Sequence, residues 1–511
     1  MSTPADTPAP PRTSRPPGRM APVNYPPPVP VEPTWIARRF EALSPRASAS
    51  ARSLIVVVVI ALAAGAFLNN GLRGIGLSAF IMCVVIALAT ATRPRTQPLV
   101  ILVVVASIAV MLMTRESGWL RLGLLFLAAV GLLTAAMLAK RGSLFNVPVT
   151  SMMTAAIDTV LHSLLTIPWL ARGLRVQVPD RSHLRPAVIA RVTLIIIPML
   201  AVVALLLASA DVFFARVIAF DPTSAIVFTV LATFGAFCCS LLLRLANLAA
   251  PPPQPTTRVE VSVLETTIAL VGLTLVLGMF VGLQWFAELS AGQDALTSRG
   301  IDLADHARSG YMQLLVAVLI VTTTLITIDR LGRRRGGTTG LLQRLLSLIV
   351  IGETLCVLAI TVRKIVLYCD AFGLTMLRLA CAAGAVWIAI VLTLTALSLV
   401  GFWAHRSWLP GAAGVALFAV TLSFAALNPQ RVVVEYNLAH ASTVPLDMRY
   451  LTSMSSDAVP TLVAAMPKLS EADAAYVQRR LCKRYAAPVA RTNWNFSWQN
   501  AKNALEPVCP R

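Results

Sequence analysis

Charged residues are scarce in this 511-residue chain: Asp, Glu, Lys and Arg together make up 13% of it. Soluble globular proteins carry about 25% charged residues, so the composition excludes an ordinary soluble enzyme. Hydrophobic residues instead make up 57%, and the mean hydropathy is +0.75. We therefore predict an all-α, polytopic membrane protein whose surroundings are the lipid bilayer.

Sequence signatures of common enzymes and metal sites are also missing. The chain has no G-x-x-x-x-G-K-[ST] phosphate loop, no H-E-x-x-H zinc helix and no G-x-S-x-G nucleophile elbow. Its five histidines are dispersed, and no two cysteines form a C-x-x-C pair. We expect no catalytic residue, metal ion or cofactor on this basis.

Acidic residues are outnumbered, with 43 Lys and Arg against 23 Asp and Glu and a formal net charge of +20. No stretch combines basic and aromatic residues as an RNA-binding strand does, so nucleic acid is not the expected partner. In a membrane protein such an excess is typical of cytoplasmic loops, where it contacts anionic lipid headgroups.

Long apolar runs predict the membrane spans, because a helix needs about 20 residues to cross the bilayer core. Eleven runs qualify, at approximately 53–68, 75–92, 99–114, 120–139, 188–207, 224–245, 263–286, 311–329, 341–361, 376–403 and 408–426.

The runs and the segments between them divide the chain into five predicted parts. These are a disordered Pro-rich arm (1–50), a four-helix membrane region (51–142), an amphipathic segment (143–187), a seven-helix membrane core (188–427) and a small extramembrane C-terminal tail (428–511). Twelve of the first 35 residues are proline, a composition that cannot form a packed core.

The segment 143–172 has apolar residues at helical spacing, but Asp158 and His162 interrupt them. An interfacial or re-entrant helix fits this pattern better than a full span. If the segment did cross the membrane, every later loop would change sides.

Basic residues predict the orientation of the chain. With a cytoplasmic N-terminus, the inner segments carry 24 basic residues and the outer loops carry nine, the C-terminal tail being left out of both counts. This excess supports a cytoplasmic N-terminus, and an odd number of spans then puts the tail outside. In an oxidising exterior Cys482 and Cys509 could form a disulfide, the alternative being two unrelated thiols.

Ionisable residues inside membrane spans are costly and therefore informative. Glu353 lies near the middle of the ninth predicted span. It is either a structural or protonated buried acid or part of a proton or ion relay. Between the ninth and tenth spans, Arg363, Asp370 and Arg378 surround a glycine-containing turn. This segment predicts either a salt-bridged hairpin or a site for an anionic headgroup.

Four blocks of residues resemble an uncharacterised family of bacterial multi-pass membrane proteins, known as a domain of unknown function. The resemblance spans roughly residues 190–505 and implies a polytopic membrane protein but no reaction. The blocks are Gln284 with Ala307-Arg308-Ser309-Gly310-Tyr311; Arg363 with Tyr368, Asp370, Gly373-Leu374-Thr375 and Arg378; Asn428-Pro429 with Tyr436-Asn437; and Asp447 with Tyr450-Leu451 and Asp457-Ala458-Val459-Pro460.

The predicted topology puts all four blocks on the exterior side of the membrane. We therefore predict one exterior polar cluster, covered by the tail. Its members are Arg308, Arg363, Tyr368, Asp370, Arg378, Asn428, Tyr436 and Asn437.

Three functions remain open for such a protein in a bacterial cytoplasmic (inner) membrane. The first is a receptor-like or accessory protein whose exterior cluster binds an envelope ligand or partner protein. The second is a transporter or channel that uses Glu353. The third is an enzyme acting on a lipid-linked substrate, with Asp447, Asp457 or Glu435 as acid or base.

Overall fold

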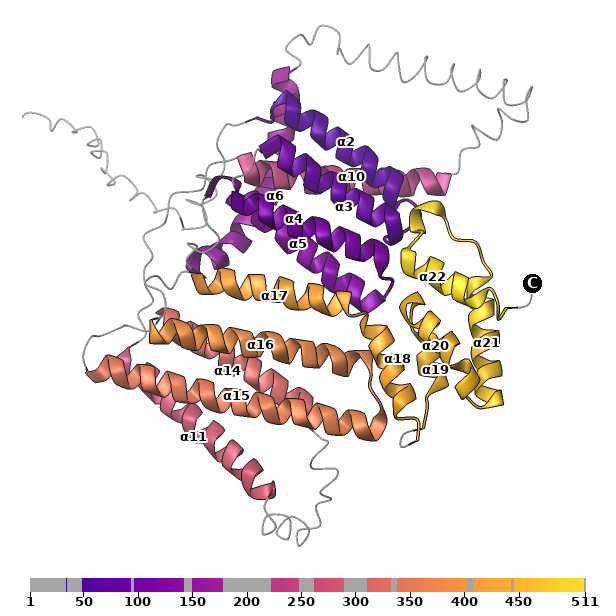
Figure 1. Cartoon of the computed structure of the whole chain (residues 1–511). Helices are drawn as coiled ribbons and strands as arrows, with labels where there is room; N and C mark the ends of the chain where they lie inside the picture. Colours follow the sequence, from indigo (N-terminus) through magenta and orange to yellow (C-terminus); the bar gives the residue numbers. More distant parts are fainter. Residues whose placement is uncertain are drawn as a thin grey trace, which may run out of the picture.

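The computed structural model describes residue 34 and residues 48–92, 96–141, 149–177, 222–247, 262–288, 310–331, 338–401, 408–442 and 445–509 (Figure 1). Within these residues there are sixteen α-helices, three short 3-10 helices and no β-strand. The prediction of an all-α fold is confirmed.

Ten helices coincide with predicted spans. Nine of them, among the described residues, are long and apolar enough to cross a membrane, and α3 is a shorter apolar helix. The chain is therefore a multi-pass membrane protein, while the predicted span 188–207 lies outside the described residues. The ten helices are α2 (Ala51–Leu68), α3 (Gly74–Thr92), α4 (Thr96–Thr114), α5 (Gly118–Arg141), α10 (Pro222–Asn247), α11 (Val263–Glu288), α14 (Tyr311–Leu331), α15 (Thr338–Phe372), α16 (Met376–Val400) and α17 (Leu409–Ala426).

Helix α15 is much longer than the predicted span 341–361, because it continues without a break to Phe372. Its last turns bury Ile365 and Cys369 in a cluster shared with the C-terminal tail. Packing on protein rather than on lipid lets the helix continue through a polar sequence. The predicted connection therefore shrinks to a turn at residues 373–375.

The spans form two groups that lie side by side (Figure 1). Helices α2 to α5 pack with α10 around one apolar core, and α11, α14, α15 and α16 surround a second. Helix α17 joins the groups, since it packs on α16 and also contacts α4 and α5. The loops that end α4 and α17 are thereby brought together.

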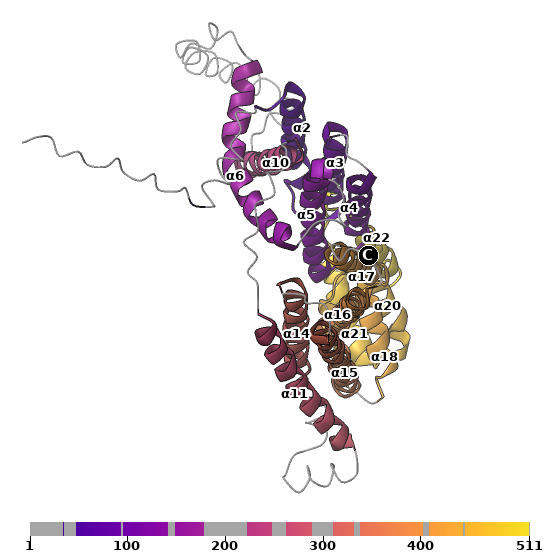
Figure 2. The same cartoon turned by 90° about the vertical axis from the view of Figure 1, so that its left-hand side faces the viewer.

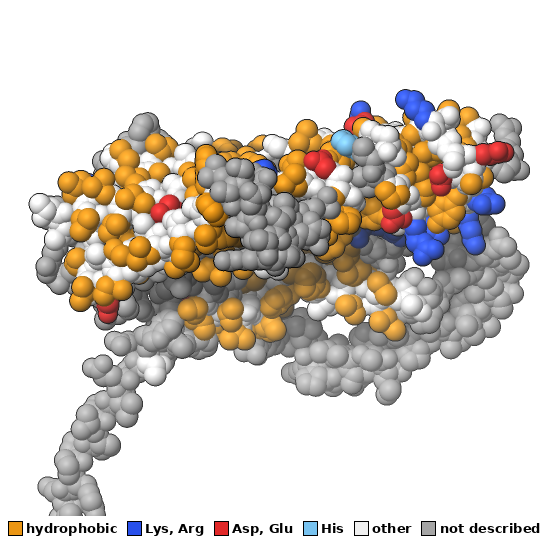
Figure 3. Space-filling view, turned by 90° about the horizontal axis from the view of Figure 1, so that it is seen from below, with side chains coloured by type: hydrophobic (Ala, Val, Ile, Leu, Met, Phe, Trp, Pro, Cys, Tyr) orange, Lys and Arg blue, Asp and Glu red, His pale blue; other side chains and the backbone are white. Residues whose placement is uncertain are grey.

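The outer surface of the spans is apolar. Large side chains such as Phe126 and Leu275 are 66% and 67% exposed. In Figure 3, hydrophobic side chains cover most of the span region, while charged ones gather at the end that carries the tail. Lipid is the solvent in which such a surface is stable.

Helix α6 (Val149–Gln177) lies across the end of the bundle where α2 begins and α10 ends (Figure 2). The Trp169 carbonyl accepts a hydrogen bond from the Ala49 amide at 3.4 Å, and Arg244 Nη1 of α10 donates to the His162 carbonyl at 2.8 Å. Asp158 and His162 are buried against the bundle, whereas Leu164 is exposed. That this segment is an interfacial or re-entrant helix stays a prediction.

The C-terminal tail is a small helical unit at the opposite end of the bundle from the start of α2 (Figure 1). Its apolar side chains form a cluster that also includes the end of α15 and the start of α16. A disulfide joins Cys482 to Cys509. The helices are α18 (Pro429–Ala439), α19 (Met448–Ser453), α20 (Val459–Ala465), α21 (Glu471–Tyr485) and α22 (Phe496–Leu505), with 3-10 turns η5 (Ser456–Ala458), η6 (Met466–Lys468) and η7 (Arg491–Asn493).

Candidate functional site at the junction of tail and spans

The turn between α15 and α16 is held by the tail through its backbone. Gly373 takes a φ of 75°, a left-handed conformation that favours glycine. Asn437 of α18 accepts a hydrogen bond from the Leu374 amide at 2.9 Å and donates to the Leu374 carbonyl at 2.8 Å. The Tyr450 hydroxyl accepts from the Met376 amide at 2.9 Å. These contacts fix the turn against α18 and α19.

Charged and aromatic side chains surround the same turn. The Tyr436 hydroxyl donates to Asp370 Oδ1 at 2.6 Å, and the Arg378 guanidinium lies 4.3 Å from the centre of the Tyr368 ring. Burial, followed by the hydrogen bond to Asp370, raises the pKa of Tyr436 and keeps its hydroxyl protonated. Arg378 also donates to the carbonyl oxygen of Gly373. Among the described residues, no ion pair joins Asp370 to Arg378.

The structure thus gathers five of the eight predicted cluster residues at this turn: Tyr368, Asp370, Arg378, Tyr436 and Asn437. Arg363 lies exposed on α15, about two turns before Asp370. Asn428 belongs to a neighbouring contact described next. Arg308 lies outside the described residues.

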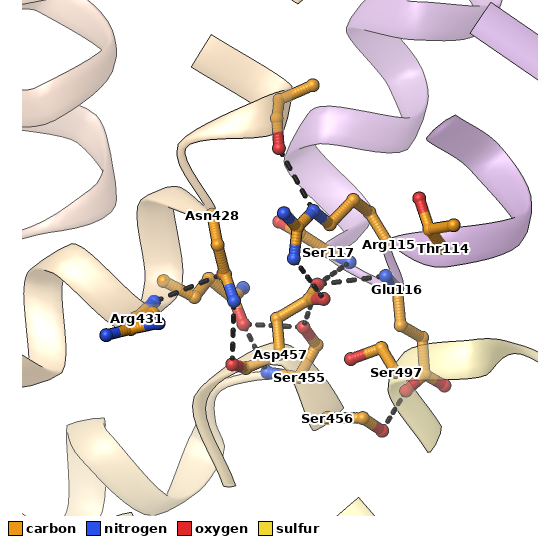
Figure 4. Close-up of polar contacts among 12 residues, drawn as sticks. Thr114, Arg115, Glu116, Ser117, Asn428, Arg431, Ser455, Ser456, Asp457 and Ser497 are labelled. Carbon is orange, nitrogen blue, oxygen red and sulfur yellow. Dashed lines mark hydrogen bonds and ion pairs between the residues drawn. The ribbon is translucent and has the colours of Figure 1, made fainter. Parts of the chain in front are cut away.

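A second polar contact, the Asp457 junction, joins the α4–α5 loop to η5 of the tail (Figure 4). Asp457 is 4% exposed. Its Oδ2 accepts hydrogen bonds from the Glu116 and Ser117 amides, at 2.9 and 3.0 Å, and from the Ser455 hydroxyl at 3.1 Å. Arg115 Nη1 lies 3.9 Å from Oδ1. One buried acid therefore accepts hydrogen bonds from two loop amides and pairs with an arginine.

The same junction also fixes the exit from α17. Arg115 donates to the carbonyl oxygens of Ala425 and Ala426, at 3.0 and 2.8 Å. These carbonyls belong to the last turn of α17, where the regular helical hydrogen bonds end, and the Ala425 carbonyl also accepts from the Asn428 amide at 3.3 Å. Asn428 then turns the chain with a φ of 53°, and its Nδ2 donates to the Asp457 carbonyl at 3.2 Å.

The start of α3 and the end of α4 form further hydrogen bonds with the tail. The Ile75 amide donates to the Trp494 carbonyl at 2.8 Å, and Asn495 Nδ2 donates to the carbonyls of Leu112 and Arg115 at 3.2 and 3.1 Å. Gly74 has a φ of 65°, and a β-carbon there would lie 2.3 Å from the Trp494 carbonyl oxygen. Only glycine allows this close approach.

Beside these contacts is an open cleft of about 360 Å³, within the size range of small-molecule sites. It is lined by spans and tail together, and we call it the junction cleft. Three of its lining side chains are arginines and one is an acid. The lining comprises Arg73, Glu116, Gly118, Trp119, Arg121, Met376, Gln430, Tyr450, Ser453, Met454, Ser455 and Arg484.

Glu353 lies in the middle of α15, away from the junction. It is next to α11, where a β-carbon on Gly278 would lie 3.0 Å from its Oε1. Its Oε2 is buried and has no hydrogen-bond partner among the described residues. The absence of a side chain at Gly278 provides the space for this carboxylate.

Sequence reasoning missed most of the junction cleft and the α4–α5 side of the Asp457 junction. In the predicted topology Arg73, Arg115 and Arg121 are exterior loop arginines that belong to no predicted site. A usable signal was present, because these three cluster in two short loops on the predicted exterior side, where basic residues are depleted. The tail residues that lie beside these arginines are more than 300 positions away in the sequence and carry no local signal.

Comparison with curated proteins and with solved structures finds no match. A family model described as Domain of unknown function (DUF4153) matches residues 100–465, more than half of the chain. The match begins well before residue 190, where the sequence resemblance was placed, and so includes the α4–α5 loop with Arg115. It ends before α21. The chain therefore belongs to the DUF4153 family of domains of unknown function.

Proposed function

We propose that this protein is a receptor-like or accessory membrane protein that binds an envelope ligand in the junction cleft. The observation that carries the proposal is the lining of the cleft, which combines residues of two spans (α5 and α16), of the α2–α3 and α4–α5 loops and of the tail. A ligand there would contact both units at once. Its binding energy could then change the stability of the packing between the tail and the spans.

The proposal includes an orientation in a bacterial cytoplasmic membrane, with the N-terminus cytoplasmic and the tail outside. It is supported by the distribution of basic residues and by the tail lying at the opposite end of the bundle from the start of α2. We expect an impermeant thiol reagent to label Cys482 and Cys509 in intact cells after treatment with an impermeant reductant. Labelling only after permeabilisation would reverse the orientation and put the cleft in the cytoplasm.

Photo-crosslinking in cells tests ligand binding directly. Trp119 lines the cleft and is 75% exposed, so it can be replaced by benzoylphenylalanine with little disturbance. Phe126, two turns deeper on α5 and 66% exposed, is the matched control. We expect an adduct at position 119 that is absent at position 126, where only acyl chains are within reach. Mass spectrometry then identifies its chemical class.

The proposal fails if the two positions give the same set of adducts, since the cleft would then meet nothing beyond bulk lipid. Stable expression of both variants, checked by gel filtration in detergent, makes this comparison interpretable.

A transporter is the second candidate, favoured by the partnerless Oε2 of Glu353 in the middle of α15. A buried acid between two helices is a typical proton-binding site in transporters. In proteoliposomes a proton-coupled transporter would acidify or alkalinise the lumen in response to a pH gradient, and Glu353→Gln would abolish this flux. A ligand-binding protein without transport shows no flux in either variant.

A further inference from the structure

We propose that the ligand of the junction cleft carries a phosphate group, an inference that rests on the proposed function and specifies its ligand class. Three arginines line the cleft, from the α2–α3 loop (Arg73), the first turn of α5 (Arg121) and α21 (Arg484). The planar guanidinium group matches phosphate oxygens with paired hydrogen bonds.

The charge of the cleft is not neutralised by the protein. Among the described residues, neither Arg73 nor Arg121 has an ion pair or hydrogen bond through its side chain. Arg484 donates one hydrogen bond, to the Met454 carbonyl at 2.5 Å, which leaves its charge uncompensated. With Glu116 as the single lining acid, the formal charge of the cleft is about +2.

The nearby acids are occupied by other partners. Glu116 accepts a hydrogen bond from the Ser456 hydroxyl, which also bonds the Tyr485 hydroxyl at 2.7 Å. Asp457 is engaged by two amides and faces Arg115. Among the described residues, neither carboxylate therefore forms an ion pair with a cleft arginine.

Two further features favour an anion. Gly118 and Trp119, the first residues of the 24-residue helix α5, line the cleft, so the positive end of the helix dipole adds to the arginines. Tyr450 accepts the Met376 amide and has its own hydroxyl proton left to donate. Burial raises the pKa of Tyr450, so this donor stays protonated.

The position of the cleft makes a phospholipid headgroup one source of the phosphate. Trp119 begins a membrane span and is largely exposed, as residues of the interfacial aromatic belt are. Basic pockets between membrane helices bind anionic headgroups at the matrix or cytoplasmic face of membranes, and the same chemistry applies here. A water-soluble phosphate compound reaching the cleft from outside is the other source, and the two are separated by experiment.

The test uses the purified full chain in neutral detergent with three probes: dioleoylphosphatidylglycerol, dioleoylphosphatidylcholine and inorganic phosphate. Binding is measured by native mass spectrometry for the lipids and by calorimetric titration for phosphate. The variant Arg73→Gln/Arg121→Gln removes two cleft charges and keeps side-chain length. The control Arg479→Gln/Arg480→Gln removes the same charge from exposed positions of α21 that do not line the cleft.

We expect wild-type protein to prefer phosphatidylglycerol over phosphatidylcholine and to lose that preference at high salt. The cleft variant should bind at least tenfold more weakly, and the control should stay within twofold of wild type. Binding of phosphatidylglycerol alone assigns the phosphate to a lipid headgroup, whereas binding of inorganic phosphate alone assigns it to a soluble compound.

Equal weakening in the cleft variant and the control would overturn the inference, because it would show attraction to total charge only. Absence of binding by both anionic probes would also overturn it. If benzoylphenylalanine at position 119 still forms its specific adduct in that case, the proposed ligand-binding function survives without the phosphate. If the cleft variant does not fold, competition by inorganic phosphate for phosphatidylglycerol on wild-type protein decides the question.

Discussion

Two polar sites lie at the interface between tail and spans, and they differ in whether their charged groups are paired within the protein. At the Asp457 junction a buried carboxylate accepts three hydrogen bonds and faces Arg115. In the junction cleft three arginines face open space with one acid among them. Both sites include residues of the α4–α5 loop, and these residues are only a few positions apart in the sequence.

The two sites therefore differ in role: one holds charges that stabilise the fold, and the other holds charges that are available to bind a ligand. A buried ion that is paired and hydrogen-bonded cannot lose its partners without a large loss of stability. Arginines that pair with no acid contribute little to stability and can bind an external anion at small cost. The comparison therefore predicts large stability effects on one side of the interface and small ones on the other.

The largest expected effect is that of Asp457→Ala. The substitution removes the acceptor of the Glu116 and Ser117 amides and the carboxylate that faces Arg115, which should lower the stability of tail docking by about 3–5 kcal/mol. Hydrogen–deuterium exchange at residues 445–509 measures the loss.

Glu435→Ala is the control for that substitution. Glu435 pairs with Arg431 at 2.7 Å, but the two side chains are 47% and 60% exposed, so less than about 1 kcal/mol is expected. Similar exchange in both variants would refute the structural role assigned to Asp457.

Removal of the disulfide comes next. Cys482 and Cys509 are separated by 27 positions, and closing a loop of that length stabilises a fold by about 3.5 kcal/mol on the loop-entropy estimate. The double variant Cys482→Ser/Cys509→Ser should lower the unfolding temperature of the tail, as should reductant on wild type. Cys356→Ala, at an exposed free cysteine of α15, should not. Reductant without effect on wild type would contradict the expectation.

Gly74→Ala should have an intermediate effect. The left-handed backbone alone costs about 1–3 kcal/mol for a residue with a side chain, and the β-carbon would meet the Trp494 carbonyl. Faster amide exchange near Trp494, with α20 unchanged, is the expected signature. Gly123→Ala on α5, where a β-carbon has no neighbour within 4 Å, is the control. Unchanged amide exchange near Trp494 in both variants would show that contact with α3 does not stabilise the tail.

Arg121→Gln should change stability least, within about 0.5 kcal/mol. The described contacts give its side chain no partner whose loss would matter. The unfolding temperatures of Arg121→Gln and Asp457→Ala, measured in the same detergent, give the comparison. A loss as large as that of Asp457→Ala would mean that the cleft arginines are structural and would remove the contrast between the two sites.

Local sequence was sufficient for most of the helices. Uninterrupted apolar runs placed ten spans, because in lipid each helix satisfies its own backbone hydrogen bonds and its length follows bilayer thickness. The end of α15 was mispredicted, since polar residues there were interpreted as a loop. Packing of Ile365 and Cys369 on the tail keeps that segment helical, and hydropathy contains no information about such packing.

The candidate site was only partly predictable. Polar residues close together in the sequence around Gly373 were recognised as a group, and Asn437 and Tyr436 do meet them. The Asp457 junction was not recognised, because Asp457 and the Ser117 amide are 340 residues apart. Neither segment has a pattern that identifies the other as its partner.

By itself, the sequence determined that this is an α-helical multi-pass membrane protein, because composition and apolar run length are local properties that lipid solvation acts on directly. It also singled out the residues of the α15–α16 turn. Only the tertiary structure decided which loops meet the tail, which acid is buried with Arg115, and which arginines remain open. Those outcomes depend on α17 bringing the ends of two helix groups together, and no local stretch of chain encodes that meeting.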